Sequence, residues 1–210
     1  MFFEPMDYNN AGLAHNPLKA IVAPRPIGWI SSCGADGSVN LAPYSFFNAV
    51  SEDPAIVMFS AQASGPGHQK DTLRNVTETG AFTVNIVGAR QVQAMNISSG
   101  DYPYGENEFN AAKLSMIQGT TVNVPHVGDV PAALECMLLH TITLPANDRG
   151  QHYTAVLGTV TGIFVDDSVV VDGKISYTLL APVARMGYRD YANINDFFEL
   201  GRPIIKIENP

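Results

Sequence analysis

The sequence predicts a mainly β protein whose strands form an antiparallel barrel. Two long segments in the last third of the chain, residues 133–144 and 152–167, are rich in β-branched and apolar residues. Glycines interrupt the predicted strands, the connections are short and helical patterns are few, which is typical of barrels. No internal repeat or linker-like stretch divides the chain, so we expect a single domain over residues 1–210.

The first quarter of the chain is expected to form an arm and a hairpin. Residues 1–24 are proline-rich and irregular, and residues 1–16 are predicted to be an N-terminal arm. The β-rich segment PIGWISSC is followed by a turn centred on Asp36-Gly37, and VNLAPYSFFNAV then forms the second arm of the hairpin. Because Pro43 has no N–H to donate, we expect pairing in that arm to end there.

The middle of the chain is expected to contain one buried strand and several short helices. AIVMFS, residues 55–60, is a short apolar run between turn signals, which indicates a strand buried on both faces. A helix is expected from Thr72, with Asp71 as its N-cap and Gly80 as its C-terminal stop. One further strand and two further helices are predicted, at residues 81–87, 89–96 and 107–114.

Composition excludes several classes of function. Apolar residues make up 46% of the 210 residues and charged residues 15%, so a core can form and disorder is excluded. The net charge is −8, with no stripe of Lys and Arg, which argues against a nucleic-acid partner. MFFEPMDYNN lacks the pattern of a signal peptide, and no apolar run approaches the roughly 18 residues of a membrane span. We therefore expect a soluble, cytoplasmic protein.

The chain offers little for metal binding or covalent hydrolysis. Cys33 and Cys136 lie far apart and without CxxC spacing, so we expect two buried thiols and no disulfide. The histidines show no HxH or HExxH spacing, and no GxSxG motif is present. Neither a metal site nor a nucleophilic serine is predicted.

A glycine- and proline-rich stretch, SGPGHQKDT, joins the buried strand to the predicted helix. In this arrangement free backbone N–H groups and the helix dipole can bind an anion. Gln69 stands where a P-loop would have glycine, so nucleotide hydrolysis is not expected. Lys70, Thr72 and the N–H groups of the helix start would bind a phosphate. The alternative is that Asp71 caps its own helix and Lys70 is merely solvated.

A second candidate is the pair of segments RPIGWISS and NLAPYSFFNAVS. They gather four aromatic and four small polar side chains: Trp29, Tyr44, Phe46, Phe47, Ser31, Ser32, Ser45 and Asn48. A flat heteroaromatic ligand needs apolar walls and a few hydrogen bonds to its edge. The alternative is that these aromatic residues form core beside a loop. Together with the loop before Lys70, the two segments favour a planar ring with a phosphate tail.

The order of these segments closely resembles the flavin reductase-like family of FMN-binding split barrels, which includes flavoredoxin and short-chain flavin reductases. RPIGWISS, NLAPYSFFN, KDTLRN, VLGTVTGIFVDD and PVARMGY follow one another as in that family, over about residues 17–194. The most specific parts are NLAPYSFFN and KDTLRN together. The resemblance implies a six-stranded antiparallel Greek-key barrel with flanking helices. It also implies a homodimer with FMN at or near the subunit interface.

The resemblance implies a set of FMN-binding residues. Lys70, Asp71 and Thr72 match the phosphate-side segment, with the backbone N–H groups of Asp71 and Thr72 as donors. Ser60 matches the end of the strand that faces the phosphate. The remaining matches are to the isoalloxazine ring and the ribityl chain: Trp29, Ser31, Ser45, Phe46, Phe47 and Asn48.

Two positions depart from the family pattern. A histidine on the nicotinamide side usually stands five residues before a strand glycine, whereas His152 precedes Gly158 by six. Either Tyr153 takes that place or the strand is bulged. The family's RxGG is here Arg185-Met186-Gly187-Tyr188, so a tyrosine at the pocket rim replaces a glycine. Arg185 either reaches the ligand or, the reading we favour, pairs with an acid.

The resemblance implies an oxidoreductase whose cofactor, FMN, carries the chemistry without an obligatory protein acid or base. The expected activity is an NAD(P)H-dependent flavin reductase, with NADH or NADPH as hydride donor. One alternative is a flavoredoxin-like electron carrier reduced by a partner protein, since an acidic surface can steer a basic partner. Another is a split barrel that has lost its flavin and serves in assembly.

Overall fold

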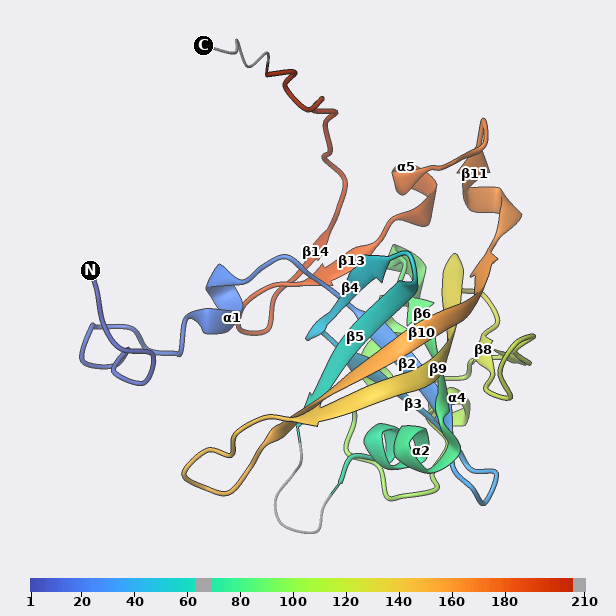
Figure 1. The fold of residues 1–210 in the computed structure, drawn as a ribbon, viewed down its shortest axis with the longest axis horizontal. Helices are drawn as coiled ribbons and strands as arrows, with labels where there is room; N and C mark the ends of the chain where they lie inside the picture. The colour runs from blue at the N-terminus through green and yellow to red at the C-terminus, as the bar shows by residue number, and fades with distance from the viewer. Residues whose placement is uncertain (63–68, 206–210) are drawn as a thin grey trace, which may run out of the picture.

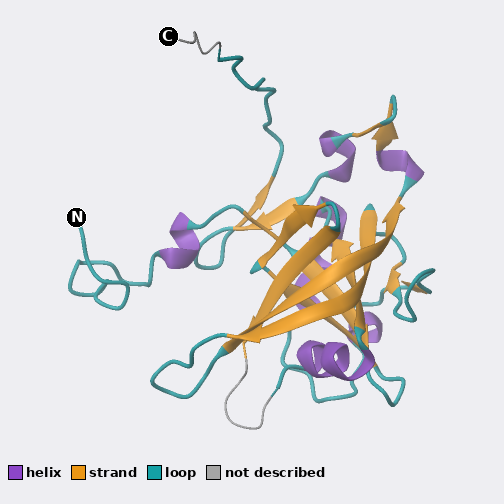
Figure 2. Cartoon of the chain, viewed as in Figure 1, coloured by secondary structure: helices purple, strands orange, loops and turns teal. Residues whose placement is uncertain are grey.

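A seven-stranded antiparallel sheet forms the body of the protein in the computed structural model, which describes residues 1–62 and 69–205 (Figure 1). Its strand order is β3-β2-β6-β9-β10-β5-β4. The bounds are β2 (Gly28–Cys33), β3 (Val39–Tyr44), β4 (Phe47–Glu52), β5 (Ala55–Gln62), β6 (Ala81–Ile86), β9 (Ala132–Thr143) and β10 (Tyr153–Val165). Figure 2 shows these strands twisted around a common interior with the helices outside them. The predicted mainly β class with flanking helices is confirmed.

One chain segment forms both edges of this sheet. β3 pairs with β2 and β4 pairs with β5, and only Ser45 and Phe46 separate the two strands. At the crossing, the N–H of Ser60 donates to the carbonyl of Phe46 at 2.8 Å. The predicted hairpin arm is therefore two strands and not one, which gives seven strands where six were expected.

Two expectations about these strands are wrong in detail. Pairing does not end at Pro43, which lies opposite Trp29, and β3 continues to Tyr44. Because β3 is an edge strand, it tolerates a residue without an N–H. β5 is not buried on both faces: alternate residues such as Val57 and Phe59 are buried, and those between them are half-buried.

The remaining elements are short. Helical segments are α1 (Leu18–Ile21), α2 (Asp71–Thr79), η1 (Ala89–Gln91), α3 (Val92–Ile97), α4 (Glu108–Ala111), η2 (Asp167–Val169) and α5 (Tyr177–Leu180). A small three-stranded sheet consists of β1 (Arg25–Pro26), β13 (Val183–Arg185) and β14 (Tyr191–Asn193). Two strand pairs are β7 (Met116–Ile117) with β8 (His126–Val127) and β11 (Val170–Val171) with β12 (Lys174–Ile175). The helices predicted at 89–96 and 107–114 are confirmed. Within the described ranges, no helix is both long and apolar enough to cross a membrane.

Two large buried apolar clusters and a small one, formed by Ala81, Val122 and Val124, fill the interior. One lies between the sheet and α2 and includes Phe59, Phe82 and Val76. The other includes Trp29 and Phe109. As a result the first turn of α2 lies close to the outer face of β2 and β3, with which α2 makes contact. Both thiols are free, that of Cys136 being buried and that of Cys33 half-buried.

Gly158 lies where β10 passes closest to the buried ring of Phe82. A Cβ at this position would lie 2.3 Å from Cζ of Phe82, and that side chain is fully buried. We expect Gly158→Ala to lower the free energy of unfolding by about 1–3 kcal/mol, because the ring has no free space to move into. Urea denaturation measures this loss. Gly201→Ala is the control, since open space surrounds Gly201; equal urea midpoints for the two variants would contradict the packing.

Candidate functional site

The N-terminus of α2 is not capped by a side chain. The helix begins at Asp71, so Lys70 occupies the N-cap position and makes no side-chain cap hydrogen bond. The expectation that Asp71 caps the helix is therefore wrong. Within residues 1–62 and 69–205, no acceptor meets the N–H groups of Asp71, Thr72 and Leu73, and the first helical bond runs from the Arg74 N–H to the Lys70 carbonyl. Gly80, with φ of 75°, ends the helix as predicted.

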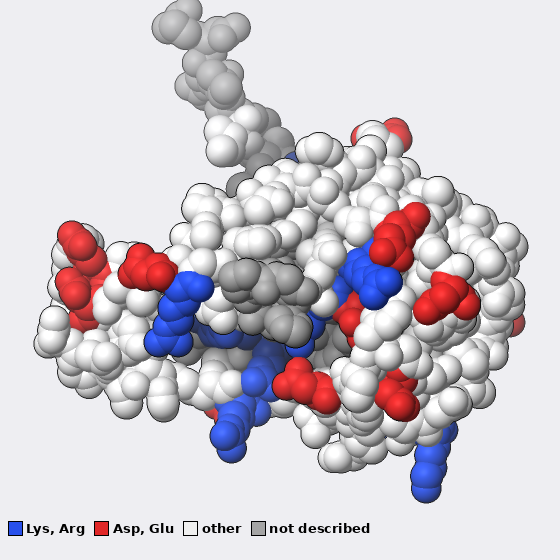
Figure 3. Space-filling model, turned by 90° about the horizontal axis from the view of Figure 1, so that it is seen from below, with Lys and Arg blue, Asp and Glu red and all other residues white. Residues whose placement is uncertain are grey.

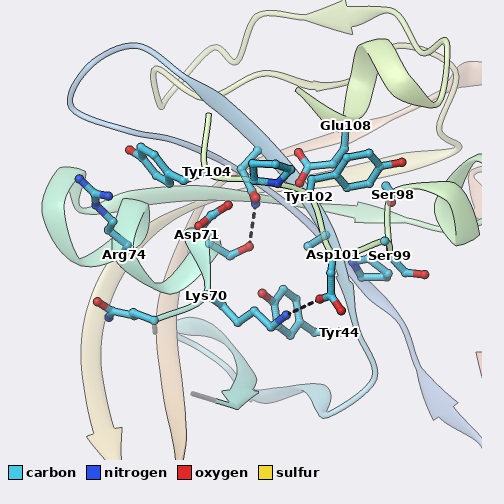
Figure 4. A pocket seen from close by; sticks show the side chains of 17 residues that line it. Tyr44, Lys70, Asp71, Arg74, Ser98, Ser99, Asp101, Tyr102, Tyr104 and Glu108 are labelled. Atoms are coloured by element: carbon cyan, nitrogen blue, oxygen red, sulfur yellow. Dashed lines mark hydrogen bonds and ion pairs between the residues drawn. The ribbon is translucent and has the colours of Figure 1, made fainter. Parts of the chain in front are cut away.

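This helix start opens into a cavity of about 630 Å³ (Figure 4). The cavity lies between β3, the first turn of α2 and the loop after α3. Its lining is Asn40, Ala42, Pro43, Tyr44, Gln69, Lys70, Asp71, Thr72, Arg74, Ser98, Ser99, Gly100, Asp101, Tyr102, Pro103, Tyr104 and Glu108. Its volume is within the range of small-molecule and cofactor sites. We call it the α2 cavity.

Charged side chains of both signs line the α2 cavity. The Nζ atom of Lys70 lies 3.1 Å from a carboxylate oxygen of Asp101, and their side chains are 46% and 95% exposed. An exposed pair of this kind contributes little free energy, so an anionic ligand can replace Asp101 beside Lys70 at low cost. The guanidinium of Arg74 pairs with Glu78 and lies 4.1 Å from the centre of the Tyr104 ring.

Polar contacts fix the floor of the α2 cavity. One carboxylate oxygen of Glu108 accepts from the Leu41 N–H at 2.9 Å. The Asn40 amide makes the most hydrogen bonds when its nitrogen donates to Glu108 at 3.2 Å and its oxygen accepts from the Thr72 hydroxyl at 2.8 Å. In that arrangement the hydroxyl proton of Thr72 is already used. Thr72 therefore has its backbone N–H, and not its hydroxyl hydrogen, to offer a ligand.

Burial raises three pKa values at this floor. It raises the pKa of Tyr44 to about 12, so the phenol is neutral at ordinary pH. It also raises the pKa of Asp71, against the opposing effects of Lys70 and Arg74. For Glu108, burial raises the pKa and the hydrogen bond from Leu41 opposes it.

The raised pKa of Glu108 makes stability depend on pH. The folded state binds the proton more tightly than the unfolded chain, in which glutamate titrates at about 4.3. This contribution is present below that value and is lost as pH rises through the folded pKa. We expect Glu108→Gln to become more stable relative to the wild type as pH rises from about 4 to 7. Urea midpoints across that range measure the difference; parallel pH curves would contradict it.

Two further cavities extend the surface beyond the α2 cavity. One of about 490 Å³ shares Pro43 and Ser99 with it. We call it the arginine cavity because Arg25, Arg185 and Arg189 line it. Another, of about 600 Å³, shares Lys19, Tyr188 and Arg189 with the arginine cavity. The three cavities thus follow one another from α2 to the N-terminal arm.

The comparison with known proteins gives the family. The family model described as "Flavin reductase like domain" matches residues 22–178. The chain belongs to the flavin reductase-like family. The resemblance seen in the sequence is thereby confirmed.

Solved structures of similar proteins agree with this assignment. Nitrilotriacetate monooxygenase component B from Bacillus cereus is 30% identical, with a TM-score of 0.86 over 95% of this chain and 98% of that chain. The 2-nitrobenzoate 2-nitroreductase NbaA of Pseudomonas fluorescens is 27% identical, with a TM-score of 0.77 over 92% and 94%. A Shewanella frigidimarina protein described as having a split barrel domain is 21% identical, with a TM-score of 0.77 over 97% and 100%, and bears on the fold alone. The predicted split barrel is confirmed.

The structure divides the predicted flavin-binding residues among several places. Lys70, Asp71 and Thr72 line the α2 cavity. Ser45 lines the arginine cavity, and Phe46 lines the third cavity. The predicted phosphate segment and part of the predicted ring segment therefore face connected cavities of this flavin reductase-like chain.

Trp29 and Ser31 lie in the core and are not among the residues that line these three cavities. Both have no exposed surface. The indole N–H of Trp29 donates to the Ser98 hydroxyl at 2.8 Å, and Ser98 in turn lines the α2 cavity. The Ser31 hydroxyl donates to the carbonyl of Pro125 at 2.5 Å. Trp29 thus holds Ser98, a residue of the cavity wall, in place, and does not itself line the α2 cavity.

Three more predicted residues lie outside the cavities. Phe47 is buried in the core, where its ring occupies the space beside Gly28. Asn48 is exposed, and its side-chain oxygen accepts from the next backbone N–H. The Ser60 hydroxyl is buried with no hydrogen-bond partner in the described part of the chain. The predicted loop at residues 64–68 lies outside the described residues.

Tyr153 lines the third cavity, whereas His152 is not among the residues that line the three cavities described above. β10 pairs residue by residue with β5 from Tyr153 to Thr159, so the six-residue spacing to Gly158 is not offset by a bulge in this part of β10. The β9–β10 pairing is irregular at this point, because Leu157 pairs with His140 and Gly158 pairs with Leu138. The unpaired extra residue therefore belongs to β9 and not to β10. The Tyr153 ring lies 5.7 Å from that of Phe46, and both line the third cavity. These positions favour the alternative in which Tyr153 takes the place of the family's histidine.

Several lining residues were not predicted from the sequence. They come from α1, from the C-terminal segment and from the loop after α3: Lys19, Arg189, Tyr191, Ser99, Asp101 and Tyr102. The sequence spacing of these residues does not predict a shared cavity, because their segments lie beside NLAPYS only in the folded chain. One signal was present: Tyr188 stands at a family glycine and has φ of 57°, the left-handed region that favours glycine. Tyr188 lines both the arginine cavity and the third cavity, which agrees with the expectation that a tyrosine replaces a glycine at the pocket rim.

Proposed function

We propose that this protein binds FMN, with the phosphate at the N-terminus of α2, and acts as a flavin-dependent oxidoreductase. The observation that carries the proposal is the uncapped first turn of α2, with Lys70 at the N-cap, facing the α2 cavity of a flavin reductase-like chain. Free N–H groups and the positive end of a helix dipole favour a phosphate. An exposed lysine beside them adds a point charge.

The residues present fit the phosphate end of FMN. The backbone N–H groups of Asp71 and Thr72 would donate to it, and Lys70 would exchange its exposed contact with Asp101 for the phosphate. The Ser60 hydroxyl of β5, which is buried and has no hydrogen-bond partner among the residues that the structure describes, also supports a ligand near this part of the sheet. On the ring side, Ser45 and Phe46 offer a hydroxyl and an aromatic wall in the neighbouring cavities.

FMN, when bound, supplies hydride acceptance and electron transfer. The chain's own residues bind, orient and shield it from water. Glu108 accepts a hydrogen bond from the Leu41 N–H, the Tyr44 phenol is neutral at ordinary pH, and the proposed chemistry assigns neither a proton transfer. No side chain of the α2 cavity is therefore assigned as an obligatory acid or base.

The hydride donor distinguishes two forms of this function. We favour an NAD(P)H-dependent flavin reductase, which the family membership supports. The net charge of −8 favours a second candidate, an electron carrier that receives electrons from a basic partner protein. Anaerobic addition of NADH or NADPH to the FMN-loaded protein separates them. Bleaching of the flavin absorbance within seconds is the result expected of a reductase. A spectrum that neither nucleotide changes would rule out the reductase and support the electron carrier.

We also propose that the protein is a homodimer. The support is a set of exposed apolar side chains on β9, namely Met137, Leu139 and Ile142, which are 44–51% exposed. Such a patch on a folded domain is typical of a contact with another protein. Sedimentation equilibrium measures the mass, and a value equal to 22.6 kDa at all concentrations would contradict the dimer.

A further inference from the structure

The arginine cavity collects four basic side chains in an acidic protein. Of the 12 Lys and Arg residues in the chain, Lys19, Arg25, Arg185 and Arg189 line this one space, although the net charge is −8. The other lining residues are uncharged: Ile27, Pro43, Ser45, Met95, Asn96, Ser99, Tyr188 and Tyr191. Figure 3 shows Lys and Arg side chains gathered in a hollow of the lower face, left of centre.

No carboxylate neutralises these four groups within the described residues. The ion pairs found there are Lys70 with Asp101 and Arg74 with Glu78, neither of which involves the arginine cavity. The expectation that Arg185 pairs with an acid is therefore wrong for this part of the chain. Its guanidinium donates to the Tyr188 carbonyl at 2.6 Å and lies 4.4 Å from the centre of the Tyr191 ring.

Arg25 is fixed in place without losing its charge. It is only 6% exposed, and its guanidinium donates to the carbonyls of Lys19, Val22 and Met186, the last at 2.8 Å. Burial, and then the positive charge of Arg185, lower its pKa. Neutral carbonyls satisfy its N–H groups but do not cancel its charge. The cavity therefore keeps like charges together at a cost that an anion would relieve.

We propose that the arginine cavity binds a phosphate monoester dianion, namely the 2′-phosphate of NADPH. Guanidinium groups match phosphate oxygens in pairs, and four cations line the cavity where the dianion carries two negative charges. The cavity adjoins the α2 cavity through Pro43 and Ser99, so a dinucleotide bound here lies beside the proposed FMN site. This inference rests on the proposed function and deepens it, because it makes NADPH and not NADH the preferred donor.

The test uses a ligand that needs no turnover. Isothermal calorimetry on the FMN-loaded protein compares 2′,5′-ADP with 5′-AMP, which lacks the 2′-phosphate. We expect 2′,5′-ADP to bind at least tenfold more tightly than 5′-AMP. We expect Arg189→Gln and Arg185→Gln each to weaken its binding about tenfold or more, since each removes a charge-assisted contact. Arg90→Gln, at an exposed position on η1, is the control and should bind as the wild type does.

The outcomes separate this inference from the proposed function. Equal binding of 2′,5′-ADP and 5′-AMP, or binding of 2′,5′-ADP that is insensitive to Arg189→Gln, overturns the subsite even if NADPH reduces the flavin. FMN affinity is measured in the same variants by fluorescence. A loss of FMN binding in Arg185→Gln and Arg189→Gln would assign the cavity to the flavin's own phosphate and also overturn the inference. Selective 2′,5′-ADP binding in a protein that no nicotinamide reduces supports the subsite and refutes only the reductase.

Discussion

Lys70→Ala is expected to weaken FMN binding about ten- to a hundredfold and to leave riboflavin binding unchanged. A charge-assisted contact to phosphate contributes about 1.5–3 kcal/mol, which corresponds to that range of affinities. Riboflavin has the same ring without the phosphate, so it does not sense the lysine. The N–H groups of the α2 start remain in the variant, and for this reason binding is weakened and not abolished. Quenching of flavin fluorescence during titration measures both affinities.

Lys174→Ala is the matched control for this experiment. It removes the same charge from an exposed position on β12, far along the chain from the α2 cavity. Its FMN affinity should equal that of the wild type. If Lys70→Ala folds normally and still binds FMN as tightly as Lys174→Ala does, the phosphate is not at α2.

Glu135→Ala is expected to cost about 2–4 kcal/mol of folding free energy. Its side chain on β9 accepts from the N–H of Thr120 at 2.8 Å, from the N–H and hydroxyl of Thr121 and from the N–H of Val122 at 3.3 Å. Alanine leaves these donors without their acceptor, and each buried one costs about 1–3 kcal/mol. Val122 and Val124 would then lose their fixed packing against Ala81. Urea denaturation measures the loss, with the exposed Glu106→Ala as control.

The same carboxylate gives a pH dependence of the opposite sign to that of Glu108. Burial raises the pKa of Glu135, but the hydrogen bonds from Thr120, Thr121 and Val122 outweigh it, so the pKa is lowered. The stability that Glu135 contributes is present above about pH 4.3, the unfolded value, and is lost as pH falls through its folded pKa. Glu135→Ala should therefore differ most from the wild type near neutral pH and less in acid. A difference that stays constant from pH 7 to pH 3 would contradict this role.

Most of the fold could be predicted because its signals are local. The long apolar strands that became β9 and β10, the Asp36-Gly37 turn and Gly80 at the end of α2 each depend on neighbours in sequence. The errors occur where tertiary structure decides. Pro43 was expected to stop a strand, but an edge position tolerates it. The arm that contains it became two strands at opposite edges of the sheet, which no local pattern indicates.

The candidate site could be predicted only in part for the same reason. Lys70, Asp71 and Thr72 are adjacent in sequence, so a single motif identifies them. Trp29 occurs in an equally recognisable motif, yet the sequence cannot tell an indole that faces a cavity from one that supports it from the core.

Apart from Arg185, the basic lining of the arginine cavity could not be predicted. Lys19 and Arg189 lie 170 residues apart in the sequence, and the pairing of β1 with β13 helps to bring their segments together.

A crystal structure of the FMN complex tests the central claim most directly. The account predicts the phosphate within about 2.7–3.2 Å of the backbone nitrogen atoms of Asp71 and Thr72, with the Lys70 ammonium beside it and turned away from Asp101. A phosphate found among Arg25, Arg185 and Arg189, with the start of α2 free of ligand, would contradict it.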